Sequence, residues 1–127
     1  MQFTGGVVKK MRYETVGDWY DDGEHLTVKV ADMGNDDYHL LVLIHELVEA
    51  YLCRKAGVKE EDVSAFDIEF EKNRKEGNTD EPGDEPEAPY FLQHQSATRV
   101  ERQLAAELGV NWNEYDEFVC NLDVVIE

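Results

Sequence analysis

Alternating hydrophobic and polar positions predict β-structure near the N-terminus. Residues 12–20 are rich in aromatic and β-branched side chains, which favour strands. Residues 26–30 alternate strictly between apolar and polar side chains, as in a strand with one buried face. The segment between them, residues 21–24, has the Asp- and Gly-rich composition of a turn. The pattern therefore predicts strands within residues 1–33, two of which form a β-hairpin.

The next segment is too long and too apolar for a strand, and it predicts a helix over residues 34–57. It contains the longest apolar run of the chain, Leu40–Ile44, and further apolar side chains follow it. Asn35 or Asp36 can cap its start, and Gly57 suits the position just after its last turn. A helix that is apolar on most sides is buried on most sides. We therefore expect this helix to lie at the centre of the fold.

Helical periodicity returns in three later segments. Residues 58–73, 90–108 and 113–121 predict helices, the first of them at the surface because most of its side chains are charged. Residues 77–89 contain all three prolines and five acidic residues with no basic one, which predicts a loop without helix or strand that is mobile over residues 77–87. The expected fold class is α+β: a single domain over residues 1–127, with a small N-terminal sheet, a buried helix and two to three further helices.

Composition narrows the possible functions. The chain has 127 residues and a formal net charge of −17, from 12 basic and 29 acidic side chains. Such a charge argues against nucleic acid and against anionic membranes as partners. No apolar run reaches the roughly 18 residues of a membrane span, and the N-terminus lacks a secretory pattern. The two cysteines, Cys53 and Cys120, are widely spaced and fit reduced thiols, so we expect a cytoplasmic protein.

The most informative stretch is His45-Glu46-Leu47-Val48-Glu49, inside the apolar helix. His45 and Glu49 stand four residues apart, so both side chains point from one helix face toward the same place. Imidazole and carboxylate groups so arranged can bind one divalent metal ion, with Zn²⁺ the most expected. Glu46 is placed to take a proton from a metal-bound water, which is the logic of a metal-assisted hydrolase.

A catalytic metal site usually has three protein ligands, so a third must come from another helix. His25 lies beside a turn and His39 shares the helix of His45, which leaves His94 as the first choice. Glu101, two helical turns after His94, is the alternative metal ligand, because both cannot reach one ion. Cys53 extends the ligand-bearing face by one turn, but we expect it to be a small buried hydrophobe.

The H-E-x-x-E pattern resembles the H-E-x-x-H motif of zincin metallopeptidases, with Glu49 in place of the second histidine. A hairpin followed by the motif helix is similar to the minimal zincin core. The chain also resembles small zincin-like proteins of phages and prophages, in which an acidic loop precedes a helix with an A-P-Y…H…E pattern. Here that pattern is Ala88–Tyr90, His94 and Glu101. The resemblance implies a metal-dependent hydrolase or peptidase that acts on a protein or peptide in a bacterial host cell.

Three alternatives stay open at this point. An all-α nucleotide pyrophosphohydrolase also binds Mg²⁺ through E-x-x-E, as Glu46 and Glu49 could, although its second motif is missing and Asp67 and Glu71 are the nearest substitutes. The charged residues of the apolar helix could instead form a salt-bridge network in the core. Finally, the strong negative charge fits a non-catalytic acidic interaction protein of a phage.

Overall fold

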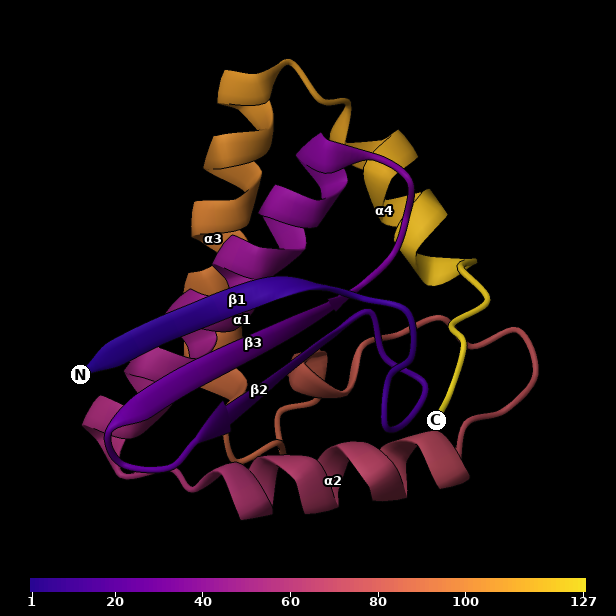
Figure 1. The fold of residues 1–127 in the computed structure, drawn as a ribbon. Coiled ribbons are helices and arrows are strands. Elements are labelled where there is room, and N and C mark those ends of the chain that lie inside the picture. The colour runs from indigo at the N-terminus through magenta and orange to yellow at the C-terminus, as the bar shows by residue number, and fades with distance from the viewer.

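In the computed structural model, which describes residues 1–127, the N-terminal region forms a three-stranded mixed sheet. The strands are β1 (Gln2–Val8), β2 (Gly17–Asp21) and β3 (His25–Ala31), with β3 in the middle (Figure 1). β2 and β3 are antiparallel neighbours, which confirms the predicted hairpin, and β1 pairs with β3 in parallel. The fold class is α+β, as predicted.

The first strand of the hairpin begins five residues later than predicted. The guanidinium of Arg12 donates from Nε to Asp18 Oδ2 at 2.6 Å, which folds residues 12–16 back toward the start of β2. The Thr15 hydroxyl donates to the Gly17 carbonyl at 2.8 Å and holds a turn there. These local hydrogen bonds compete with strand pairing, so the β-branched composition of this segment does not decide its structure.

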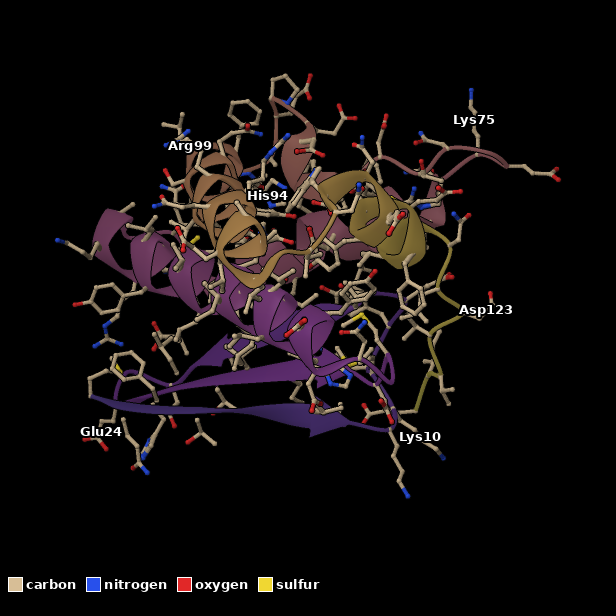
Figure 2. All side chains as sticks on the ribbon, turned by 90° about the horizontal axis from the view of Figure 1, so that it is seen from above. Lys10, Glu24, Lys75, His94, Arg99 and Asp123 are labelled. Atoms are coloured by element: carbon tan, nitrogen blue, oxygen red, sulfur yellow. The ribbon has the colours of Figure 1, made fainter.

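Helix α1 (Asp36–Ala56) is the central element of the fold. It packs on β2 and β3 on one side and on α3 (Phe91–Leu108) on the other, and Figure 2 shows this order of layers. Contact on two sides explains why the sequence of α1 is apolar on most faces. Asn35 caps its start by accepting a hydrogen bond from the Tyr38 amide, and Gly57 ends it in the left-handed conformation. Both caps were predicted.

The other helices begin and end within two residues of the predicted bounds. They are α2 (Glu60–Lys72), α3 and α4 (Trp112–Cys120). The segment between α2 and α3 was predicted to contain no helix, and that is wrong for Pro82–Asp84, which form the short 3₁₀ helix η1. Proline fits the first position of such a turn, because its missing N–H needs no partner there. None of the helices is both long and apolar enough to cross a bilayer.

Candidate metal centre

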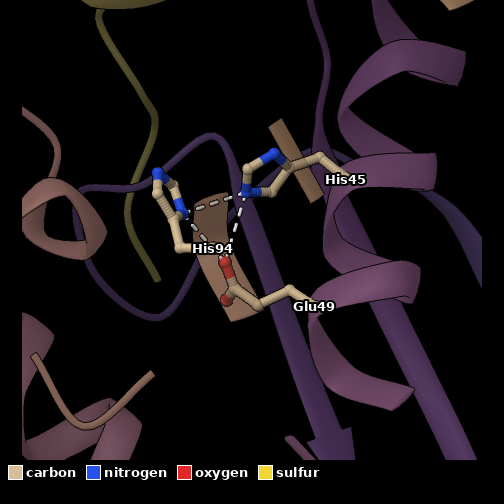
Figure 3. Close-up of side chains that lie close together, drawn as sticks. All are labelled: His45, Glu49 and His94. Carbon is tan, nitrogen blue, oxygen red and sulfur yellow. Dashed lines mark hydrogen bonds and ion pairs between the residues drawn. The ribbon is translucent and has the colours of Figure 1, made fainter. Parts of the chain in front are cut away.

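Three buried side chains from α1 and α3 converge on one point. His45 and Glu49 lie one turn apart on α1, and α3 brings His94 against them (Figure 3). Nε2 of His45 lies 3.2 Å from Oε2 of Glu49 and 3.1 Å from Nδ1 of His94, and the latter two atoms are 2.9 Å apart. The residues are only 7%, 4% and 4% exposed, respectively. This His–Glu–His group unites three of the four predicted ligand residues.

The spacing of these three atoms fits a small divalent ion. A tetrahedral ion with bonds of about 2.0–2.1 Å keeps its ligand atoms about 3.3 Å apart. The three separations, 2.9–3.2 Å, are slightly shorter than this value. Two imidazoles and one carboxylate are a donor set of catalytic zinc sites, which leave a fourth position for water.

The outer nitrogen of His45 is held by a buried carboxylate. Nδ1 of His45 lies 2.7 Å from Oε1 of Glu101, and the Tyr115 hydroxyl donates to Oε2 of the same carboxylate at 2.6 Å. Because a carboxylate oxygen accepts, Nδ1 of His45 donates to Glu101. Nε2 is left facing Glu49 and His94, where it donates to Glu49 while it carries a proton and offers its lone pair to a metal ion once that proton is lost. Glu101, the alternative ligand of the sequence analysis, therefore lies outside the His–Glu–His group and orients one of its members.

Glu49 is fixed through both of its oxygens. Oε2 faces the two imidazoles, and Oε1 accepts a hydrogen bond from the indole N–H of Trp19 at 3.1 Å. Burial disfavours its charge, but the hydrogen bonds with His45 and His94 outweigh burial and lower the pKa of Glu49 to about 2. Glu49 is therefore a carboxylate at neutral pH, and it needs a neighbouring positive charge, which protons on the imidazoles or a metal ion can supply.

His94 presents its other nitrogen to the acidic segment before α3. Its Nε2 lies 2.9 Å from Glu81 Oε2 and 3.3 Å from Asp84 Oδ1, although neither carboxylate has hydrogen-bond geometry with it. Burial opposes protonation of this ring, but the carboxylates of Glu49 and Glu81 raise the pKa of His94 to about 10. The prediction that the carboxylates of residues 77–89 lack a basic partner is therefore wrong for Glu81 and Asp84, because α3 supplies one. Mobility of this loop stays a prediction.

Gly83 explains how the acidic segment comes so close to His94. It is buried in η1, and a Cβ atom at this position would overlap the imidazole ring. Glycine thus allows the backbone of η1 to pack directly on the ring. The same turn carries Asp84 and follows Glu81, so the packing of Gly83 places both carboxylates at the outer nitrogen.

Glu46, the predicted general base, lies next to the ligand group. It lines a cavity of about 220 Å³ together with His45, Glu49 and His94. Its side chain passes over Gly17 at the start of β2, where any Cβ would collide with it. Burial and the negative charge of Glu49 raise the pKa of Glu46 well above its ordinary value. The structure therefore places a half-buried carboxylate in the cavity that the three ligand atoms face.

Sequence reasoning did not foresee the role of Asp67 in the same cavity. Asp67 accepts hydrogen bonds from the hydroxyls of Tyr13 and Tyr90, and burial raises its pKa to about 7. Glu71, one turn later on α2, is paired with Arg74 at 2.8 Å. Both candidates for the missing pyrophosphohydrolase motif thus line the cavity but have hydrogen-bond or ion-pair partners of their own, and the three-stranded sheet does not fit an all-α enzyme.

The remaining candidates lie outside the group, as predicted. His25 is exposed and pairs with Asp22 at 3.2 Å. His39 accepts a hydrogen bond from the Met33 amide at 2.8 Å. Cys53 is fully buried in the hydrophobic core.

Comparisons with protein-family models, with curated proteins and with solved structures find no match for this chain. The resemblance to zincins therefore rests on the H-E-x-x-E motif and on the order of the elements around it. The structure itself shows an α+β fold with a buried His–Glu–His group whose spacing suits a divalent metal ion.

Proposed function

We propose that this protein is a zincin-like metal-dependent hydrolase, with a divalent ion, Zn²⁺ most expected, bound by His45, Glu49 and His94. One observation carries the proposal: three potential ligand atoms from two helices meet within 3.2 Å of one another in a buried place. The outer carboxylate of Glu101 leaves Nε2 of His45 free to act as a ligand. A buried anion with two imidazoles aimed at it is costly unless protons or a metal ion balance the charge.

The neighbouring residues suit hydrolysis. A Zn²⁺ ion bound there would supply a water of lowered pKa and a positive charge that favours the ionised form of Glu46. Glu46 would be the residue positioned to accept a proton, since its carboxylate lines the same cavity and comes from the same turn of α1 as His45. Glu49 keeps a fixed position through its contact with Trp19, and the His45 imidazole does so through Glu101. The motif resemblance makes a peptide or protein the expected substrate.

Elemental analysis of the protein purified without chelator tests the metal site. We expect one ion per chain to survive gel filtration in the wild type. His45→Ala, Glu49→Ala and His94→Ala should each lose it, since two ligands hold an ion far more weakly than three. His25→Ala is the matched control, because it removes an exposed imidazole. A wild-type protein without metal, or retention of the ion by all three variants, would refute the proposal.

A further inference from the structure

The outer side of His94 has an arrangement that the proposed hydrolase site does not use. Nε2 of this ring is a buried polar atom without a hydrogen-bond partner, in a residue that is 4% exposed. It points at two carboxylates, Glu81 Oε2 at 2.9 Å and Asp84 Oδ1 at 3.3 Å. The three ligand atoms lie within 4.8 Å of one another.

Solvent reaches the two carboxylates in front of this buried nitrogen. The side chains of Glu81 and Asp84 are 44% and 52% exposed, whereas that of His94 is 6% exposed. A cation can thus approach the carboxylates directly from water and reach the imidazole behind them. Two carboxylates and one imidazole suit a divalent transition-metal ion such as Zn²⁺ or Mn²⁺.

The segment that carries the carboxylates is held in place by contacts that form no ion pair between these carboxylates and a lysine or arginine. Arg74 donates to the carbonyls of Asn78 and Asp80 at 2.6 and 2.8 Å, and Gly83 packs on the His94 ring. Gln95 Nε2 donates to Asp84 Oδ1 at 3.4 Å. No lysine or arginine forms an ion pair with Glu81 or Asp84. Their negative charges therefore meet only the imidazole, across a gap without a proper hydrogen bond.

We propose that His94 Nε2, Glu81 and Asp84 bind a second divalent cation, so that the His94 ring bridges two ions. This inference rests on the proposed function for the inner ion. With only the inner ion bound through Nδ1, Nε2 keeps its proton. Binding of the second ion releases that proton to solvent and uses the freed nitrogen lone pair. The outer ion is the weaker of the two, because its carboxylates are half-exposed and compete with water.

Titration of metal-free protein with Zn²⁺ against a chromophoric chelator tests this site. We expect two binding steps in the wild type. Glu81→Gln and Asp84→Asn should each weaken the second step by at least tenfold and leave the first. His94→Ala should lose both steps, and His45→Ala should lose only the tight one. Glu87→Gln is the matched control, because it removes an exposed charge from the same segment.

The outcomes separate this inference from the proposed function. A single tight step that Glu81→Gln and Asp84→Asn leave unchanged would show that both carboxylates only orient His94, which overturns the second site and leaves the hydrolase site intact. Two steps that survive both substitutions would identify the second ion as surface binding to an acidic protein, which also overturns it. A protein without a step sensitive to His45→Ala would refute the inner site itself. Circular dichroism of each variant verifies that it is folded.

Discussion

The two imidazoles of the His–Glu–His group are supported in opposite ways. The outer nitrogen of His45 meets Glu101, which also accepts from Tyr115, and all three residues are buried on helices. The outer nitrogen of His94 meets Glu81 and Asp84, which are half-exposed and belong to the segment between helices. The His45 imidazole is thus positioned by a chain of buried hydrogen bonds, and the His94 imidazole faces two acidic side chains that solvent reaches.

The side of His45 is therefore rigid, whereas the side of His94 is accessible to solvent. Charge-assisted hydrogen bonds in a buried place are stronger than ion pairs in water, so the support of His45 fixes its ring before any ion arrives. The side of His94 carries two negatively charged side chains, and solvent reaches both of them. Substitutions on the two sides should therefore differ in size, and the following predictions test that difference from the largest effect to the smallest.

Glu46→Gln should have the largest effect, and on catalysis alone. The substitution removes a proton acceptor but touches neither outer support, so hydrolysis of a casein substrate should fall by about 10²-fold or more. Zinc content should stay at the wild-type level. Loss of zinc in this variant would mean that Glu46 is a ligand, and unchanged hydrolysis would exclude it as the base.

Glu101→Gln should weaken zinc binding by about 10–100-fold. Glutamine keeps the shape of the side chain and removes the charge that orients Nδ1 of His45. A chelator competition assay gives the affinity, with Glu107→Gln, an exposed position on the same helix, as the control. Equal affinities for Glu101→Gln and the control would contradict the rigid support of His45.

The stabilising contributions of Glu49 and His94 in the metal-free protein should both be complete between about pH 4.5 and 6.5. Despite burial, Glu49 and Glu81 raise the pKa of His94 from 6.5 to about 10, so its contribution is complete below 6.5 and is lost as pH rises through about 10. Despite burial, hydrogen bonds with the two histidines lower the pKa of Glu49 from 4.5 to about 2, so its contribution is complete above 4.5 and is lost as pH falls through about 2.

The melting temperature of the protein in EDTA, measured at a series of pH values, tests this prediction. We expect the melting temperature to fall by several degrees, on the order of 5 °C, between pH 6.5 and 10. His94→Ala should flatten this decline, and His25→Ala should keep it. Saturating Zn²⁺ should remove the alkaline loss, because the ion takes the place of the protons. An alkaline decline of the same size in His94→Ala would assign it to other groups.

Gly83→Ala should have the smallest effect on metal affinity, about two- to fivefold. The new methyl group overlaps the His94 ring, and the half-exposed segment can give way more easily than a ring on α3. We therefore expect faster proteolysis within residues 77–89 and only a modest loss of zinc affinity. A loss as large as that of Glu101→Gln would show that η1 fixes His94 as firmly as Glu101 fixes His45.

Local sequence determined the hairpin, the helices and two of the three members of the His–Glu–His group. The alternation over residues 26–30 and the caps Asn35 and Gly57 act between near neighbours, so they are visible in a short window. The spacing of His45 and Glu49 is also visible in a short window, because one helical turn brings the two side chains together wherever the helix lies. The pattern did not indicate β1 as a separate strand, since its residues are mostly exposed and show no alternation.

Tertiary structure decided which side chains from distant segments of the chain contact one another. Gly5 in β1 lies against the side chain of Leu43 in α1, where a Cβ atom would overlap a leucine methyl group, and only the packed fold shows this contact. His94 was found by elimination among the histidines. The assignment of Glu101 to the outer nitrogen of His45, and of Glu81 and Asp84 to that of His94, required coordinates. Helix periodicity fixes which residues share a face, but the angle and depth at which two helices pack decide which atoms of those residues meet.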